Sequence, residues 1–208
     1  EVKHCALVGE MLAKMHLAGK DFPKSQENLR SFSWWQQTIP LVLPHLNTAQ
    51  KDLLTHELST QEAFFSSSNY DILPQGASHC DLFRDNVLFD SKGSADTNND
   101  QLGGFFDFYF AGTDKWLFDL AVTANDWCLA ENKHDLDPAL FKALMQAYQS
   151  VRPLTNEEQA SWPLMVRAAA LRFWVSRLWD FYLPRDAQML TPHDPTHFER
   201  ILLSRRTL

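Results

Sequence analysis

Apolar residues recur at the spacing of one helix face in several stretches of the chain. Between residues 2 and 17 they fall at i, i+3, i+4 and i+7, as Val8, Met11, Leu12 and Met15, and this period predicts a core helix. The same period, with start and stop signals, predicts further helices over residues 48–65, 119–131, 138–151, 156–182 and 194–205. The pattern is therefore that of a mostly helical chain.

Two short apolar stretches follow a different pattern. Residues 87–90 and 102–106 are rich in Val, Leu and Phe, and the polar residues 91–100 between them include several turn formers. They predict one β-hairpin with a long connection, which we interpret as a tolerated surface insertion. Residues 71–77 are expected to form a loop, and the helix that begins near Phe32 is expected to be short and broken by proline. The expected fold class is α+β, predominantly α.

Composition narrows the class of protein. The chain has 208 residues, 45% hydrophobic and 22% charged, enough for one core or two packed subdomains. A net charge of -7 disfavours a nucleic-acid partner. No apolar stretch is long enough to cross a bilayer and no signal-peptide pattern opens the chain, so no membrane partner is expected. The three scattered cysteines, Cys5, Cys80 and Cys128, favour a reducing cytoplasm.

The candidate chemistry lies at residues 78–89. His79, Asp81, Leu82 and Asn86 match the pattern His-x-Asp-Leu-x-x-x-Asn of kinase catalytic loops. Phosphoryl transfer needs a group that orients and deprotonates the acceptor hydroxyl, which we assign to Asp81, and hard oxygen ligands for Mg²⁺. Asn86 is expected to supply one ligand, and the predicted hairpin brings Asp107 beside it as the principal carboxylate ligand.

Two further residues are expected to support the site structurally. His79 belongs to the motif itself. Asp119 is expected near the N-terminus of a helix, where a carboxylate caps backbone N–H groups and complements the helix dipole. His193 and His197 have the spacing of zinc ligands, but Pro195 lies between them and no third ligand is near. We interpret these histidines as loop and helix-start residues.

Other parts of a kinase are missing from the sequence. The seven glycines form no glycine-rich phosphate loop, and no lysine lies in a strand of the type that pairs with a helix glutamate. Residues 1–208 are therefore expected to be the larger helical lobe of a kinase-like protein, without the N-terminal lobe that clamps the nucleotide. Such a chain alone is expected to bind ATP poorly and to turn over little or nothing.

The motif at residues 78–89 resembles the Brenner-type motif of the aminoglycoside phosphotransferase and choline kinase superfamily. Residues 12–19, 104–111, 119–128 and 169–178 support this resemblance, which is strongest to the homoserine kinases of the superfamily. It implies a kinase-like fold, ATP and Mg²⁺ as cofactors, and cytoplasmic phosphorylation of L-homoserine on its side-chain hydroxyl in threonine biosynthesis. It gives Asp81, Asn86 and Asp107 the roles assigned above.

An amino-acid acceptor needs an acidic group for its ammonium and a cationic group for its carboxylate. Asp126 is the candidate for the first, Arg84 or Arg172 for the second, and Trp127 is a candidate pocket wall. Each also has an ordinary alternative, because a charged residue on a helix usually faces solvent or forms a surface ion pair.

Several alternatives stay open at this point. The acceptor could instead be an aminoglycoside, choline or another amino alcohol, which would call for acidic or aromatic groups around the pocket. A kinase-like binding module without catalysis has no chemical need for Asp81, Asn86 and Asp107 together. A metal-dependent hydrolase lacks further ligands, and a protein kinase is disfavoured by Cys80 and Tyr109, which replace the arginine and glycine of its usual motifs.

Overall fold

The computed structural model describes residues 1–90, 100–183 and 192–208. The predicted insertion over residues 91–100 therefore lies, except for Asp100, outside the described residues. The α-helices are α1 (Val2–Ala18), α2 (Phe32–Val42), α3 (Thr48–Phe65), α4 (Ser68–Asp71), α5 (Trp116–Trp127), α6 (Pro138–Val151), α7 (Asn156–Tyr182) and α8 (Thr196–Arg205). The strands are β1 (Gln75–Ser78), β2 (Val87–Asp90), β3 (Gln101–Phe105) and β4 (Gly112–Lys115), and short 3₁₀ helices include η1 (Leu43–His45), η2 (Arg84–Asn86) and η4 (Phe108–Phe110).

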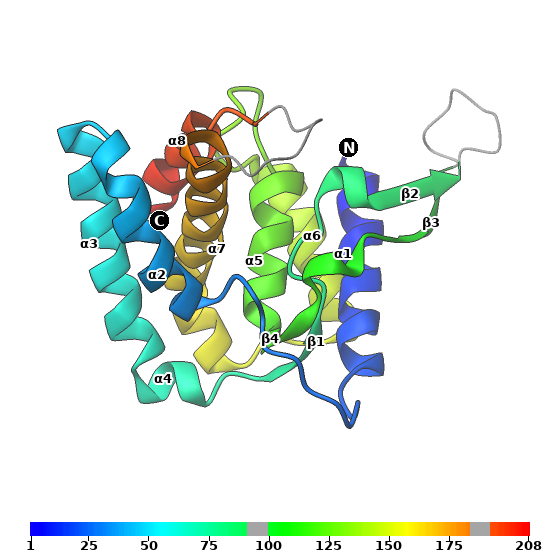
Figure 1. Cartoon of the computed structure of the whole chain (residues 1–208). Coiled ribbons are helices and arrows are strands. Elements are labelled where there is room, and N and C mark those ends of the chain that lie inside the picture. The colour runs from blue at the N-terminus through cyan, green and yellow to red at the C-terminus, as the bar shows by residue number, and fades with distance from the viewer. Residues whose placement is uncertain (91–99, 184–191) are drawn as a thin grey trace.

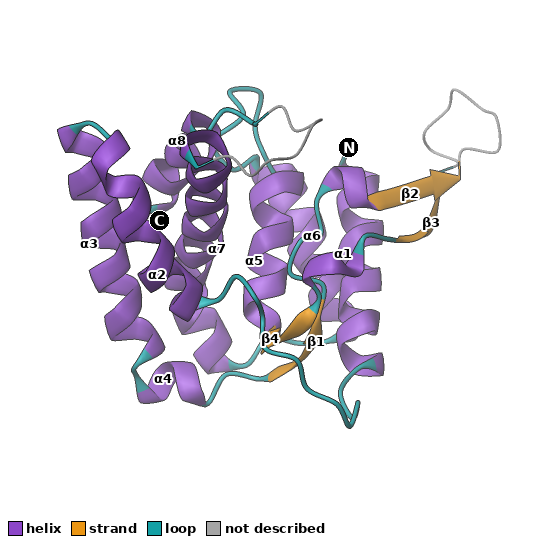
Figure 2. Cartoon of the chain, viewed as in Figure 1, coloured by secondary structure: helices purple, strands orange, loops and turns teal. Residues whose placement is uncertain are grey.

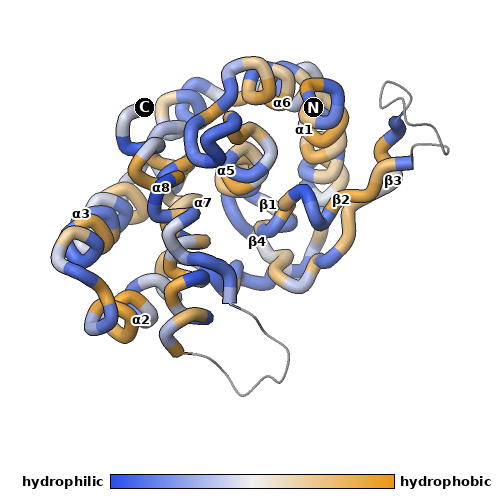
Figure 3. The backbone as a smooth tube through the Cα atoms, turned by 90° about the horizontal axis from the view of Figure 1, so that it is seen from above, coloured by the Kyte–Doolittle hydropathy of each residue, from blue (hydrophilic) through white to orange (hydrophobic). Residues whose placement is uncertain are grey.

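Helices α5 and α7 form the centre of the arrangement, with α2 and α3 on one side and α1 and α6 on the other (Figure 1). All residues of α5 are buried, as expected for a helix covered on every side. The outer helices α1 and α3 carry both hydrophobic and hydrophilic residues along their length (Figure 3). The core is thus helix on helix, and the predicted class, α+β with mostly helices, is confirmed.

Local signals explain where the long helices begin. Asn47 and Gln50 form a reciprocal capping box at α3, and Thr155 and Glu158 form another at α7. Asp137 caps α6 by accepting from two backbone N–H groups. The predicted start of each of these helices agrees with the structure to within a residue.

The helix that begins at Phe32 is not broken at its first proline. Pro40 lies inside α2, which continues to Val42, and Pro44 stands in the following 3₁₀ turn. Proline has no N–H, so one intrahelical hydrogen bond is lost. Because Pro40 lies less than three residues before the end of α2, this loss is near the C-terminus of the helix. The expectation of a break was correct only for the second proline.

The strands form two separate two-stranded antiparallel sheets (Figure 2). The predicted hairpin is the β2–β3 sheet, with a register shift between Leu88 and Phe89. The β1–β4 sheet was not predicted, because residues 75–78 and 112–115 are small and polar and show no apolar alternation. It joins segments 34 residues apart, so the pairing has no local sequence signal. In the described part of the chain, no helix has both the length and the apolar character needed to cross a bilayer.

Close packing of α1 on α6 depends on one small residue. A Cβ atom added to Gly9 would lie 2.4 Å from the backbone oxygen of Leu144, a contact that neither backbone can relieve without moving. Glycine in a helix interior normally costs about 1 kcal/mol relative to alanine. The close approach of the two helices therefore outweighs this local preference.

We predict that Gly9→Ala lowers the free energy of unfolding by about 1–3 kcal/mol, because overpacking outweighs the gain in helix propensity. Urea unfolding followed by circular dichroism measures it. The reverse change at an exposed helix position, Ala160→Gly, is the control and should cost about 1 kcal/mol through propensity alone. A more stable Gly9→Ala protein would contradict the packing argument.

Candidate active site

The motif loop begins where β1 ends. Ser78, the last residue of β1, pairs with Gly112 of β4, and the chain then passes into His79 and Cys80. Cys80 has a φ of 63°, in the left-handed region that residues other than glycine seldom occupy. Such a conformation persists only where the surrounding structure fixes the backbone.

Asp119 fixes this backbone from the first turn of α5. Its Oδ2 accepts a hydrogen bond from the N–H of His79 at 2.7 Å, and its Oδ1 accepts one from the N–H of Cys80 at 2.8 Å. Helix α5 begins after Lys115, with no side-chain cap. The predicted capping role of Asp119 is therefore wrong, because both carboxylate oxygens bind the motif loop instead of the helix's own N-terminus.

Other buried side chains orient Asp119. His16 Nε2 donates to Asp119 Oδ2 at 3.0 Å, because an ionised carboxylate only accepts. His16 Nδ1 lies 2.7 Å from the hydroxyl of Tyr148, which also accepts from Arg152 at 3.1 Å. Arg152 in turn pairs with Glu158 at 2.7 Å. This line of contacts connects the loop to α1, α5, α6 and α7.

The same contacts keep Asp119 ionised. Burial by itself would raise the pKa of this carboxyl group. The hydrogen bond from His16, the charges of His16 and His79, and the backbone N–H of His79 outweigh burial, so the pKa of Asp119 lies below its usual value.

The loop is also bound to the segment that carries Asp107. Asn86 Nδ2 donates to the backbone oxygen of Asp81 at 2.8 Å, and the N–H of Phe106 donates to the backbone oxygen of Asn86 at 3.1 Å. His79 Nε2 donates to the backbone oxygen of Phe106 at 2.9 Å. Asp107 follows with a φ of 60°. The two halves of the predicted site thus meet through hydrogen bonds to the backbone of Phe106, the residue before Asp107.

Asp81, Asn86 and Asp107 line one hollow of about 230 Å³, and Arg172 lies in its wall. Burial raises the pKa of Asp81, although the charges of Arg172, His79 and Arg177 act in the opposite direction. Because the Asn86 amide nitrogen is used by the loop, its Oδ1 remains as the atom that can face a cation. The hollow therefore combines one carboxyl group of raised pKa with two residues that offer hard oxygen ligands.

This donor set fits one kind of metal site. In the described ranges, no group of three or more His, Cys, Asp or Glu side chains is arranged to hold a metal ion. An all-protein cage is therefore not present there. Mg²⁺ usually binds through one or two carboxylates together with substrate phosphates, and Asn86 and Asp107 fit that arrangement.

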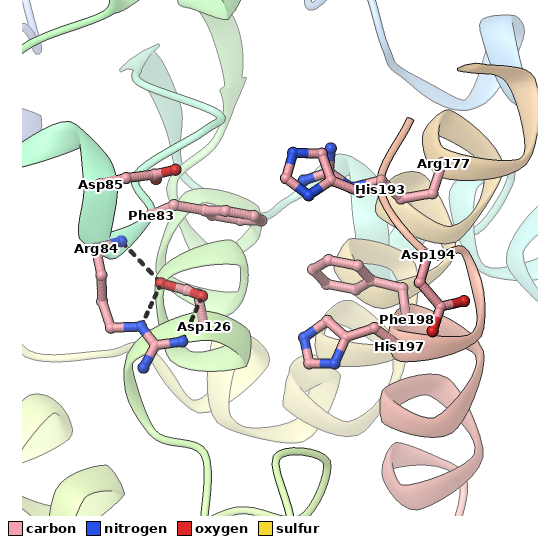
Figure 4. Close-up of a pocket in the computed structure, with 9 residues that line it drawn as sticks. All are labelled: Phe83, Arg84, Asp85, Asp126, Arg177, His193, Asp194, His197 and Phe198. Carbon is pink, nitrogen blue, oxygen red and sulfur yellow. Dashed lines mark hydrogen bonds and ion pairs between the residues drawn. The ribbon is translucent and has the colours of Figure 1, made fainter. Parts of the chain in front are cut away.

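Two of the predicted acceptor contacts bind each other. The guanidinium of Arg84 donates from Nε to Asp126 Oδ2 at 3.0 Å and from Nη2 to Asp126 Oδ1 at 3.1 Å. The backbone N–H of Arg84 also donates to Asp126 Oδ2, at 2.7 Å. Figure 4 shows this pair in the wall of a second hollow. Separate roles for Asp126 and Arg84, one for an ammonium and one for a carboxylate, do not agree with this geometry, because each charge is already neutralised by the other.

The remaining two predicted contacts differ from each other. Trp127 is buried, its Nε1 donates to the backbone oxygen of Leu82 at 3.2 Å, and its ring packs on Phe89. It packs against the loop and lines neither of these two hollows, so its role as a pocket wall stays a prediction. Arg172, in contrast, lies beside Asp81, with its Nη1 3.7 Å from Asp81 Oδ1.

The structure also brings in residues that the sequence analysis did not assign to the site. Arg177 and His193 line both hollows together with Phe83 and Asp85, and His197 lines the second. His193 lies in a loop and His197 at the start of α8, as predicted. The sequence did offer one signal, because Arg177 falls within residues 169–178, a stretch that carries the superfamily resemblance.

The fold is that of the kinase-like phosphotransferases of known structure. An aminoglycoside phosphotransferase from Alicyclobacillus acidocaldarius has the same fold with a TM-score of 0.61 at 16% identity, over 100% of this chain and 64% of that one. An ethanolamine kinase from Plasmodium vivax gives a TM-score of 0.60 at 14% identity, over 100% and 58%. Residues 1–157 match the phosphotransferase enzyme family, and the chain belongs to that family. The predicted superfamily resemblance is confirmed.

Sequence relatives are much nearer. The homoserine kinase of Cupriavidus necator is 62% identical over 205 residues, which are 99% of this chain and 61% of that protein. The homoserine kinase of Ralstonia pickettii is 57% identical over 204 residues, 98% of this chain and 60% of that protein. The chain thus spans about three fifths of the length of these relatives.

We predict that Asp119→Ala lowers the free energy of unfolding by about 3 kcal/mol, because two buried N–H groups and His16 lose their acceptor. Chemical unfolding at neutral pH measures the loss. Asp52→Ala, at an exposed position of α3, is the control and should change stability by less than about 0.5 kcal/mol.

The difference in the free energy of unfolding between wild type and Asp119→Ala should depend on pH. A carboxyl group whose pKa is lowered by folding stabilises the protein above its unfolded pKa of about 4, and this contribution is lost as pH falls through the lowered pKa. The difference between wild type and Asp119→Ala should therefore shrink below about pH 4. An equal loss at every pH would exclude an ionised Asp119 as the cause.

Proposed function

We propose that the full-length protein containing this chain is a homoserine kinase, which transfers the γ-phosphoryl group of ATP to the side-chain hydroxyl of L-homoserine in threonine biosynthesis. The observation that supports this acceptor is the 57–62% identity to proteins named homoserine kinase over 97–99% of the chain. The phosphotransferase family and the Asp81, Asn86 and Asp107 hollow support the reaction class. The reaction takes place in the cytoplasm.

Asp81 is the proposed catalytic base. The acceptor hydroxyl oxygen forms a bond to the γ-phosphorus, the bond from that phosphorus to the bridging oxygen of ADP breaks, and Asp81 takes the hydroxyl proton. Burial raises the pKa of Asp81, which brings its proton affinity closer to what a base needs at neutral pH. Its main task is to aim the hydroxyl in line with the phosphate.

Asn86 and Asp107 are the proposed ligands of Mg²⁺. When bound with ATP, the metal neutralises charge on the phosphates. Asn86 can act as a ligand without losing its place, because its amide nitrogen is held by the Asp81 backbone oxygen at 2.8 Å. His79 and Asp119 keep the loop in position through the hydrogen bonds described above.

We further propose that residues 1–208 are the helical C-terminal lobe and that the nucleotide-clamping lobe belongs to the remaining length of the full protein. The chain spans about three fifths of its relatives, and it holds the proposed base and metal ligands but no glycine-rich phosphate loop. The chain alone should then bind ATP poorly.

The test of the acceptor is an ATP-consumption assay with Mg²⁺ on the full-length protein. It compares L-homoserine with choline, an aminoglycoside and other amino alcohols at equal concentrations. Turnover confined to L-homoserine supports the proposal. Turnover with another acceptor alone would keep the phosphotransfer chemistry and overturn the homoserine assignment, and silence with all acceptors would favour a binding module.

We predict that Asp81→Asn in the full-length protein reduces kcat by about 10²–10⁴-fold, the usual contribution of a positioned base. The amide has the same shape but cannot take the proton, so folding should be largely preserved. Initial rates and a thermal unfolding curve measure the two effects. The control Asp52→Asn makes the same change in charge away from the hollow and should keep the wild-type kcat. A near-normal kcat for Asp81→Asn would show that Asp81 is not the base.

A further inference from the structure

Arg177 stands where two hollows meet. It lines the hollow that contains Asp81 and also the second hollow, of about 380 Å³, whose residues Figure 4 shows. Phe83, Asp85 and His193 are the other residues shared by both hollows. A molecule whose hydroxyl reaches Asp81 and whose far end extends toward the second hollow would pass Arg177.

Among the residues that the structure describes, the guanidinium of Arg177 has no hydrogen-bond partner. No hydrogen bond or ion pair within 4 Å joins it to another residue in the described ranges, although four carboxylates lie close enough to act on its charge: Asp81, Asp180, Asp85 and Asp126. Arg84 in the same wall is different, because Asp126 occupies its guanidinium through two hydrogen bonds. Arg84 therefore has fewer donors left for an anion than Arg177.

A second arginine of α7 is also incompletely paired. Arg172 is 3% exposed, and its Nε and Nη2 have no hydrogen-bond partner among the residues described. Its ring neighbours, Phe173 and Phe110, offer stacking contacts at 3.8 and 4.9 Å but no acceptor oxygen. A buried guanidinium with unsatisfied donors is costly unless an anion completes it. On its α7 side the hollow is thus lined by two arginines, Arg172 and Arg177, and one carboxylate, Asp180, so positive charge is in excess there.

The opposite wall carries charge of the other sign. Asp85 comes from η2, has an exposed carboxylate, and faces the hollow from the side opposite Arg177 (Figure 4). A zwitterionic acceptor needs both a cationic and an anionic group. The junction of the two hollows offers this combination.

We propose that Arg177, with Arg172 behind it, binds the carboxylate of an α-amino-acid acceptor and so selects amino acids over amino alcohols. This inference rests on the proposed function and names the group that determines its acceptor class. Arg177 takes the carboxylate role for which Arg84 was a candidate, because the charge of Arg84 is satisfied by Asp126. A guanidinium fork suits a carboxylate, because it can donate two parallel hydrogen bonds.

The experiment measures kcat/KM in the full-length protein for L-homoserine and for its amide, L-homoserinamide. The amide keeps the hydroxyl, the ammonium and the size of the amino acid but has no negative charge. For Arg177→Gln we expect kcat/KM for L-homoserine to fall by about 30- to 300-fold, with less than a threefold change for the amide and for the KM of ATP. Arg177→Lys, which keeps the charge without the fork, should retain an intermediate preference.

Arg200→Gln is the matched control, since it removes one positive charge from an exposed position of α8 that lines neither hollow. It should leave kcat/KM unchanged for both L-homoserine and L-homoserinamide. If kcat/KM falls equally for both acceptors in Arg177→Gln, Arg177 contacts the phosphate or is needed for folding, and the inference is overturned. Unchanged homoserine turnover in Arg177→Gln would also overturn it while leaving the proposed function intact. A wild-type protein that does not use L-homoserine would overturn both.

Discussion

The buried carboxylate of Asp119 is the interaction on which the site depends. The motif loop contains a residue in the left-handed region, Cys80. The loop follows β1, whose pairing with β4 ends at Ser78. Beyond that point no strand of the described part of the chain pairs with the backbone, and without Asp119 the N–H groups of His79 and Cys80 would be buried without acceptors. Asp119 accepts both at 2.7 and 2.8 Å, so one side chain on a buried helix does what a longer sheet would otherwise do.

This arrangement connects the loop to the helical core by hydrogen bonds. Asp119 is itself held by His16, and the contacts continue through Tyr148 to Arg152 and Glu158. The members come from four helices, with Tyr148 in α6 and Arg152 at its C-cap, so displacing the loop requires hydrogen bonds of all four to change. Buried polar networks that are fully satisfied specify one arrangement of their elements. Here that arrangement sets the position of Asp81 relative to Asp107.

Sequence analysis could predict which residues gather at the candidate site because these residues are joined by local structure. Asp81 and Asn86 lie in one short motif, and a hairpin brings Asp107 to them. The β1–β4 sheet, the loop contacts of Asp119 and the Arg84–Asp126 pair could not be recovered, since each joins segments about 34 to 42 residues apart without any periodic signal. For the same reason Arg84 and Asp126 looked like two available charges when they are one closed pair.

The two arginine–aspartate contacts near the site differ in distance, and this difference decides whether the carboxylate oxygens remain available. Arg84 and Asp126 are joined by two side-chain hydrogen bonds near 3 Å, which occupy both carboxylate oxygens. Arg172 stays 3.7 Å from Asp81, beyond hydrogen-bond distance. A bidentate bond there would lower the pKa of Asp81 and block the lone pairs that a base needs. At 3.7 Å the guanidinium partly offsets the cost of a buried carboxylate, but burial prevails and the pKa of Asp81 stays raised. The imperfect contact therefore leaves Asp81 able to accept a proton, and it leaves donors of Arg172 for an anion that enters the hollow.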